Sequence, residues 1–341
     1  MPESLERRLP VYLLLDCSES MVGDGLQFVQ QGVTSIVKEL RGDPQALETV
    51  WLSAITFSNR AELITPLCEL DKFVAPALRA RPGTAIGAAL DLLCDRVRAE
   101  VRPNTPTQKG DWRPVAFLLT DGSSTDEWED AARRVRSLRV NLVAIACGPD
   151  ADLHILSRIT ESVVALQGYS SGDFMKLFRW ISSSVTTASR RVMTKGDAEV
   201  ALADLPQGVL SRPTNGKAAP PARSGLPREM FLAVRCTRTK QPYLLRHHLN
   251  TATGSYQPVR THVIDDGYLG AMPENSATSA VSTDRIGGAL PCPHCGNPVW
   301  GRCTCGALLC LPASECTVVC PGCGSSSQFA PMSFDVSGRK G

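Results

Sequence analysis

The most constraining feature of this chain is an alternation of apolar strand-like segments with amphipathic helix-like segments, which continues to about residue 190. Strands that alternate with helices in this way form a mostly parallel sheet with helices on both faces. The pattern therefore predicts a doubly wound α/β domain over residues 8–190. The predicted strands are Val11–Leu15, Val50–Phe57, Ala61–Leu67, Val115–Thr120, Leu142–Ala146 and Val163–Leu166, and the predicted helices are Leu26–Leu40, Ile86–Val101, Glu129–Leu138, Leu153–Ile159 and Phe174–Ser189.

A D-x-S-x-S run, formed by Asp16, Ser18 and Ser20, directly follows the first predicted strand. Two later motifs take similar positions, since Thr84 precedes a helix and Asp121 ends a strand. Ligands of open parallel sheets bind beyond the carboxyl ends of the strands, so these side chains are expected to converge. Carboxylate and hydroxyl oxygens suit Mg²⁺ or Mn²⁺. The competing interpretation is local, with Asp16 and Ser18 as helix caps and Asp121 in an ordinary turn.

In this order, the three motifs resemble the von Willebrand factor A domain with a complete metal-ion-dependent adhesion site, over about the first half of the chain. The resemblance implies a Rossmann-like fold. It also implies that Ser18 and Ser20 ligate Mg²⁺ through their hydroxyls, that Thr84 joins them in the ligand-ready state, and that Asp16 and Asp121 hold the metal directly or through waters. One coordination position is then left for an acidic side chain of a partner protein.

The length of 341 residues exceeds the usual size of a single core and favours two domains. Residues 191–228 are rich in Gly, Pro, Ala and Ser, which predicts a linker. Residues 229–341 are expected to form a small β-rich domain. Its first predicted strands are Met230–Cys236, Pro242–His247 and Val259–Ile264.

The end of the chain concentrates cysteines in a segment too short for an adequate apolar core: Cys292, Cys295, Cys303, Cys305, Cys310, Cys316, Cys320 and Cys323. A C-P-x-C-G turn places two thiolates on one side of a knuckle, and two such turns can supply the tetrahedral set that zinc prefers. We therefore expect a zinc ribbon with at least one Zn²⁺, and eight ligands suffice for two.

The spacing leaves the grouping of these cysteines open. Local pairing gives Cys292, Cys295, Cys303 and Cys305 on one ion and Cys310, Cys316, Cys320 and Cys323 on another, whereas a crossed arrangement joins the two C-P-x-C-G knuckles. His294 lies between two ligands and is expected to be exposed. A redox C-x-x-C pair is disfavoured because no thioredoxin-like βαβ context surrounds the knuckles.

A von Willebrand A domain followed by such a module resembles the bacterial TerY family, which is associated with tellurite-resistance and stress gene clusters. The segments that carry the resemblance are Cys236–Tyr243 and Cys292–Cys323. The resemblance implies action beside a PP2C-type phosphatase and a serine/threonine kinase. It indicates a non-enzymatic, Mg²⁺-dependent scaffold or adaptor that binds proteins in bacterial stress response, tellurite resistance or phage defence.

Charge and hydropathy bound the remaining classes. With 36 basic and 34 acidic residues, the net charge of +2 argues against wholesale electrostatic binding to nucleic acid or membrane. The first residues lack the apolar core of a signal peptide, and no apolar run approaches the length that spans a bilayer. We therefore expect a cytoplasmic protein, whose 13 cysteines are buried thiols or metal ligands.

Two alternative functions remain. A phosphate-ester hydrolase would use a metal at Asp16 and Asp121, but the chain has no G-x-x-x-x-G-K-[ST] loop and no Cys-x₅-Arg motif. Ser18 also stands where a haloacid dehalogenase-type phosphatase carries a second Asp. A nucleic-acid-binding ribbon would use a basic stretch whose only interleaved aromatic is Tyr243. That stretch comprises Arg235, Arg238, Lys240, Arg246, His247 and His248.

Overall fold

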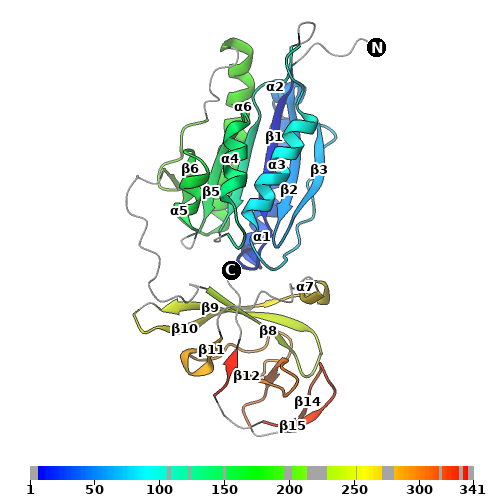
Figure 1. Ribbon diagram of the computed structural model, residues 1–341, viewed down its shortest axis with the longest axis vertical. Coiled ribbons are helices and arrows are strands. Elements are labelled where there is room, and N and C mark those ends of the chain that lie inside the picture. The colour runs from blue at the N-terminus through cyan, green and yellow to red at the C-terminus, as the bar shows by residue number, and fades with distance from the viewer. Residues whose placement is uncertain are drawn as a thin grey trace. The chain divides into compact units, whose positions relative to one another are not determined.

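The chain forms two compact units, which divide between residues 218 and 219 (Figure 1). The computed structural model describes residues 7–105, 109–121, 124–148, 151–195, 202–212, 229–250, 252–270, 280–314, 317–329 and 333–336. Within these ranges, no helix combines the length and the apolar character needed to cross a bilayer.

The first unit is built on a seven-stranded sheet in the order β3-β2-β1-β4-β5-β6-β7 (Figure 1). The strands from β2 across to β6 pair in parallel, while the edge strands β3 and β7 pair antiparallel to their neighbours. The carboxyl ends of β1 and β4 therefore lie side by side at one edge of the sheet. The strands are β1 (Leu9–Asp16), β2 (Val50–Phe57), β3 (Ala61–Glu69), β4 (Val115–Thr120), β5 (Asn141–Cys147), β6 (Val163–Leu166) and β7 (Leu210–Ser211).

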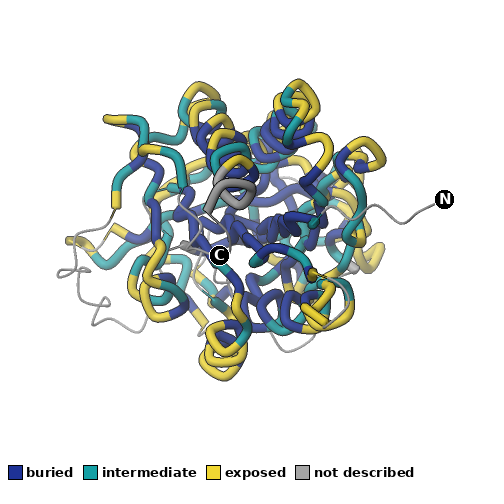
Figure 2. The backbone as a smooth tube through the Cα atoms, turned by 90° about the horizontal axis from the view of Figure 1, so that it is seen from above, coloured by how far each residue is buried: buried dark blue, intermediate teal, exposed yellow. Residues whose placement is uncertain are grey.

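Helices cover both faces of this sheet, and successive residues of β1 point to opposite faces. Val11 and Leu13 pack in the apolar layer that includes α1 and α6, whereas Tyr12 and Leu14 pack in the layer that includes α3, α4 and α5. The helices are α1 (Asp24–Arg41), α2 (Pro44–Thr49), α3 (Ile86–Glu100), α4 (Glu129–Ser137), α5 (Leu153–Ile159) and α6 (Ser171–Lys195). Figure 2 shows buried inner turns and exposed outer turns on the helices. The predicted doubly wound, mostly parallel fold is confirmed.

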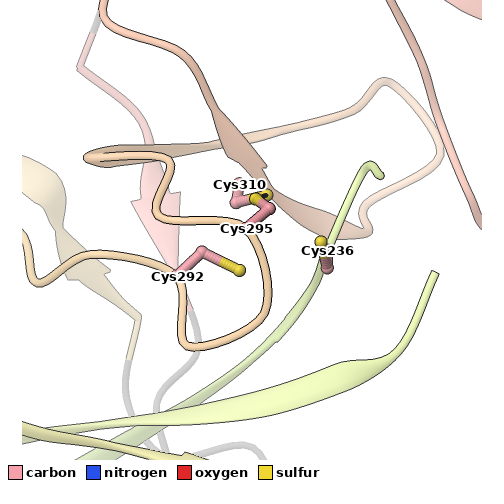
Figure 3. A group of neighbouring side chains, drawn as sticks. All are labelled: Cys236, Cys292, Cys295 and Cys310. Carbon is pink, nitrogen blue, oxygen red and sulfur yellow. Dashed lines mark hydrogen bonds between the residues drawn. The ribbon is translucent and has the colours of Figure 1, made fainter. Parts of the chain in front are cut away.

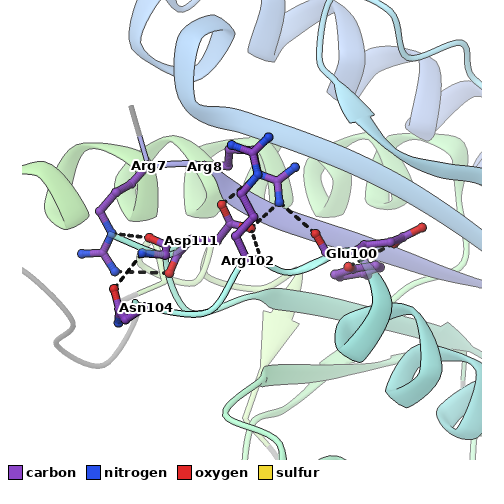
Figure 4. Close-up of polar contacts among 8 residues, drawn as sticks. Arg7, Arg8, Glu100, Arg102, Asn104 and Asp111 are labelled. Carbon is purple, nitrogen blue, oxygen red and sulfur yellow. Dashed lines mark hydrogen bonds and ion pairs between the residues drawn. The ribbon is translucent and has the colours of Figure 1, made fainter. Parts of the chain in front are cut away.

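A polar network secures the start of β1, at the end of the strand remote from the D-x-S-x-S run (Figure 4). The largely buried Arg8 side chain pairs with Asp111 at 2.5 Å and donates to the Glu100 carbonyl at 2.8 Å. Arg7 donates to the Gly110 carbonyl at 2.7 Å and stacks its guanidinium over the Trp112 ring. A largely buried ion pair with these additional hydrogen bonds fixes where the central strand begins.

The predicted linker over residues 191–228 is only partly a connection. Helix α6 continues to Lys195, and residues 202–212 pack on the first unit. Within that segment, Val209 and Leu210 are buried, β7 pairs with β6, and the Trp180 indole donates to the Ala203 carbonyl at 3.0 Å. The composition of this stretch gave no sign of β7, because a two-residue edge strand is too short to show a periodic pattern. The rest of the predicted linker, residues 196–201 and 213–228, lies outside the described residues.

The second unit is built on a five-stranded sheet in the order β10-β9-β8-β13-β12. Strands β8, β9 and β10 form an antiparallel meander, and the parallel pairing of β8 with β13 joins this meander to the cysteine-rich end. The strands are β8 (Glu229–Arg235), β9 (Pro242–Asn250), β10 (Ser255–Val263), β11 (Val281–Ser282), β12 (Val299–Arg302), β13 (Leu308–Leu311), β14 (Thr317–Val319), β15 (Ser326–Gln328) and β16 (Asp335–Val336), with a short helix α7 (Asp266–Gly270).

The main apolar cluster of the second unit mixes hydrophobic side chains with cysteines. Tyr243, Leu245 and Tyr256 are buried there together with Cys292 and Cys310. A smaller cluster, centred on Leu309, contains two further cysteines. Buried cysteines therefore form part of both apolar clusters of this unit.

Candidate metal centres

The D-x-S-x-S run and Asp121 meet at the carboxyl edge of the first sheet. Asp16 ends β1, and Asp121 directly follows the neighbouring strand β4. Both carboxylates are buried, as are the Ser18 and Ser20 hydroxyls of the loop that leaves β1. The sheet thus holds two carboxylates and two hydroxyls close together in a largely water-excluded position.

Hydrogen bonds connect these four residues. The Ser18 amide donates to Asp16 Oδ1 at 2.8 Å, and the Ser18 and Ser20 hydroxyls lie 2.9 Å apart. The Ser20 hydroxyl donates to Asp121 Oδ1 at 2.5 Å. On the other side of the group, the Thr120 hydroxyl donates to Asp16 Oδ2 at 2.5 Å. These bonds fix the four oxygen-bearing side chains in one arrangement.

Thr84 lies in the adjoining loop, immediately before α3. Its neighbour Gly83 donates its amide to the buried Glu19 carboxylate of the D-x-S-x-S loop at 2.9 Å. Thr84 itself is fully buried, and its Oγ1 has no hydrogen-bond partner among the described residues. A buried hydroxyl without a partner is costly, so this oxygen is a candidate ligand for a bound ion.

The electrostatics also favour a cation. Burial raises the pKa of Asp16 to about 6, against the hydrogen bonds from Ser18 and Thr120 that lower it. No ion pair of the described residues involves Asp16. A bound divalent cation would supply the missing positive charge. The adjacent Cys17 thiol is buried, which raises its pKa, and a neutral thiol is a poor ligand for a hard cation.

The residues present therefore fit a hard divalent cation. The donors are carboxylate and hydroxyl oxygens, and one of them, Thr84 Oγ1, lacks any other partner among the described residues.

Four cysteines of the second unit form a first metal-binding group (Figure 3). Cys236, Cys292, Cys295 and Cys310 place their sulfurs within 4.8 Å of one another. The Cys295 and Cys310 sulfurs lie 3.6 Å apart, too far for a disulfide and close to the roughly 3.8 Å expected for two thiolates on one tetrahedral zinc. All but Cys295 are buried.

A second group consists of Cys303, Cys305, Cys320 and Cys323. The sulfurs of Cys303 and Cys323 lie 3.7 Å apart and those of Cys305 and Cys320 lie 3.8 Å apart, again the separation expected around one zinc. Cys305 and Cys323 are exposed. The two groups therefore share their chemistry and differ in their access to solvent.

Three turns with the same hydrogen bonds carry ligands into the two groups. In the turns that begin at Cys292 and Cys320, the cysteine carbonyl accepts from the glycine four residues later at 2.9 Å. The Cys236 turn repeats this bond with Lys240, whose φ of 63° is unusual for a residue other than glycine. Sequence reasoning missed Cys236 as a ligand because this turn has a single cysteine and lacks the terminal glycine. Its signal was a cysteine at the end of a predicted strand.

Hydrogen bonds to sulfur favour the thiolate form that binds zinc. Burial raises the pKa of Cys236, but hydrogen bonds from Thr239 and Arg238 outweigh it and lower the pKa to about 6. Hydrogen bonds from Ser325 lower the pKa of Cys323, also to about 6. The Cys310 sulfur accepts from the Thr237 amide at 3.3 Å.

The structure corrects both groupings considered from the spacing. Cys303 and Cys305 do not join Cys292 and Cys295, and the two C-P-x-C-G knuckles belong to different groups. Cys316 lies outside the described residues. His294, expected to be exposed, is half-buried, and its Nε2 lies 3.1 Å from the Pro242 carbonyl.

The basic stretch considered for nucleic acid does not act as one charged surface. Arg235 forms an ion pair with Asp266 at 2.8 Å. His247 is fully buried, and burial lowers its pKa to about 4, so it is neutral at physiological pH. Arg246 lies over the Phe231 ring.

Comparison with known families assigns both units. Residues 11–178 match the von Willebrand factor type A domain, and residues 228–341 match the TerY-C metal binding domain. A search of curated proteins found no match.

Similar solved structures cover about half of the chain. Proximal thread matrix protein 1 from the mussel byssus is 17% identical, with a TM-score of 0.42 over 53% of this chain and 48% of its own. A von Willebrand factor type A protein from Catenulispora acidiphila is 18% identical, with a TM-score of 0.42 over 53% of this chain and 43% of its own. BatB from Bacteroides thetaiotaomicron is 19% identical, with a TM-score of 0.37 over 51% of this chain and 97% of its own. The chain thus spans about half the length of the mussel protein.

Proposed function

We propose that this chain, which joins a von Willebrand factor type A domain to a TerY-C metal-binding domain, is a non-enzymatic adaptor whose first domain binds a partner protein through a divalent cation. Mg²⁺ is the proposed physiological ion, with Mn²⁺ as its substitute. The proposed ligands are Asp16, Ser18, Ser20, Thr84 and Asp121, which bind directly or through waters. The observation that carries the proposal is the hydrogen-bonded set of buried oxygens beside the partnerless Thr84 Oγ1.

A bound divalent cation would supply positive charge and could accept a further oxygen ligand. The residues of this chain hold the donors in place, and their burial keeps them largely out of contact with water. An Asp or Glu of a partner protein completes the coordination. Charge and coordination are then provided together, so the interaction requires both the metal and the partner's carboxylate.

The second domain is proposed to hold two Zn²⁺ ions. Cys236, Cys292, Cys295 and Cys310 bind one, and Cys303, Cys305, Cys320 and Cys323 bind the other. The sulfur separations of 3.6 to 3.8 Å support this assignment. Every described cysteine is a free thiol, which is consistent with a reducing compartment, and we propose the cytoplasm.

We further propose that the zinc domain docks a second component, so that the chain brings two proteins together. A serine/threonine kinase and a PP2C-type phosphatase are the proposed partners, in stress response, tellurite resistance or phage defence. This part rests on the resemblance to the TerY family.

Titration calorimetry tests the first site. Wild type should bind Mg²⁺ with a heat that Asp16→Ala and Asp121→Ala lose, while the far-ultraviolet circular dichroism of both variants stays unchanged. Equal Mg²⁺ affinity in wild type and Asp16→Ala would reject the site. Pull-downs from the native host with Asp16→Ala, and with a chain that ends after residue 228, should each lose a different partner.

A further inference from the structure

We propose that Thr125 and Asp126 are positioning residues that fix Thr84 for metal binding. This inference rests on the proposed function of the first unit and deepens it. Both residues lie in the segment that follows Asp121, on the described stretch 124–128. They contact the Thr84 loop by hydrogen bonds, and neither is among the proposed ligands.

Thr84 and Thr125 exchange two hydrogen bonds. The Thr84 amide donates to Thr125 Oγ1 at 3.0 Å, and the Thr125 amide donates to the Thr84 carbonyl at 2.9 Å. Both backbone polar groups of Thr84 therefore bond to Thr125, and the Thr84 carbonyl also accepts from the Ile86 amide at 3.1 Å. The side-chain oxygen of Thr84 is the polar group left over, and it is the one proposed to bind the cation.

Asp126 holds the other side of the same loop by capping α3 from outside the helix. The residue before α3, Ala85, has no side chain that can cap it. Asp126 accepts from the Gly87 amide at 2.9 Å and from the Ala88 amide at 2.8 Å. A carboxylate at a helix N-terminus satisfies two amides that have no partner within the helix. Ser124 orients it, since its hydroxyl donates to Asp126 Oδ1 at 2.8 Å.

The approach of the two loops depends on glycine at position 87. A Cβ there would lie 2.3 Å from the Glu127 carbonyl and 2.9 Å from Asp126 Oδ2. Upstream of Thr84, the Gly83 amide donates to Glu19, so the Thr84 backbone is held on both sides. These contacts fix the Thr84 loop against residues 124–127 of the segment that follows β4.

The experiment measures Mn²⁺ binding to the full-length, zinc-loaded chain by electron paramagnetic resonance. The variants are Thr84→Ala, Asp126→Ala, Thr125→Val and the double variant Thr84→Ala/Asp126→Ala. Thr125→Ser is the matched control, because it keeps the oxygen that accepts from the Thr84 amide. Thermal unfolding without Mn²⁺ is recorded for each variant, and relaxation of water protons counts the waters on the bound ion.

Removal of an outer partner of a metal ligand commonly weakens binding about 10- to 100-fold, so Asp126→Ala and Thr125→Val should each weaken Mn²⁺ binding about tenfold. Thr125→Ser should bind like wild type. The double variant should bind no more weakly than Thr84→Ala, since both changes remove the same contact. The bound ion should carry an additional water in Asp126→Ala, as in Thr84→Ala.

Two results would overturn the inference in distinguishable ways. If Thr84→Ala weakens binding while Asp126→Ala and Thr125→Val do not, or if the two losses add in the double variant, Thr125 and Asp126 do not act through Thr84 and the proposed function stands. If Thr84→Ala binds Mn²⁺ like wild type, the proposed ligand set fails and the inference fails with it.

Discussion

The two units place their metal-binding groups in opposite relations to their cores. In the first unit, two apolar layers fill both faces of the sheet, and the oxygen donors lie beyond them at the sheet edge. In the second unit, Cys236, Cys292 and Cys310 are themselves members of the main core cluster. We therefore expect the first fold to form without its proposed ion and the second, whose core includes the metal-binding cysteines, to depend on its proposed ions.

Removal of zinc gives the sharpest test of this difference and the largest expected effect. Binding of a structural zinc contributes roughly 10–16 kcal/mol in small domains, which exceeds the stability of most folds. A strong chelator, or Cys310→Ser, should therefore unfold the second unit and leave the first intact. Hydrogen exchange should show the loss of amide protection in β8 and β9 and its retention in β1 and β4. Protection of β8 that survives complete zinc removal would contradict the comparison.

A cavity in the apolar core should have the converse effect. Leu118 is fully buried in β4, and Leu118→Ala should lower the free energy of unfolding of the first unit by about 2–5 kcal/mol. The zinc content of the Leu118→Ala chain, measured by atomic absorption, should stay at the wild-type value. Leu47→Ala is the matched control, because Leu47 is 42% exposed and its loss should change stability by less than about 0.5 kcal/mol.

His247 should make the second unit more stable as pH rises. Burial lowers its pKa to about 4, so between about pH 4 and pH 6.5 the unfolded chain binds a proton that the folded chain excludes. The resulting stability, about 3 kcal/mol, is present above pH 6.5 and is lost as pH falls toward 4. His247→Leu should remove this part of the pH dependence. The measurement is the difference in the free energy of unfolding between wild type and His247→Leu, determined with denaturant at each pH. If that difference in free energy of unfolding stays constant from pH 4 to pH 7, His247 does not cause the pH dependence.

Asp16 should give the first unit the opposite pH dependence when no metal is present. Burial raises its pKa to about 6, so the folded chain keeps a proton that the unfolded chain releases near pH 4. Stability should fall by about 2–3 kcal/mol as pH rises from about 4 to 6. Asp16→Asn should remove this loss and make the metal-free unit more stable at pH 7, while Mg²⁺ should stabilise wild type alone. If metal-free Asp16→Asn and metal-free wild type unfold at the same temperature at pH 7, the ionised Asp16 carboxylate does not destabilise the first unit.

The sequence predicted local elements well and long-range partners poorly. The strand Val115–Thr120 and the helix Leu153–Ile159 are confirmed at their predicted bounds, because each shows a clear apolar pattern between strong breakers. The grouping of the cysteines depends instead on the parallel pairing of β8 with β13, which brings Thr237 to Cys310 across 73 positions. Nothing in the cysteine spacing encodes that pairing. The hydrogen bonds of the Thr84 loop are also non-local, and no sequence motif identifies Asp126 as the residue that caps the N-terminus of α3.

The interleaving of the two cysteine groups has a consequence for synthesis. Cys303 and Cys305 belong to one group but lie in the chain between Cys295 and Cys310 of the other. Cys236 is therefore synthesised long before Cys310, the last cysteine of its group. A chain that stops before Cys310 lacks at least one cysteine of each group. The first group is complete only once Cys310 has been made and the second only once Cys323 has been made, so neither proposed zinc site can form from the earlier cysteines alone.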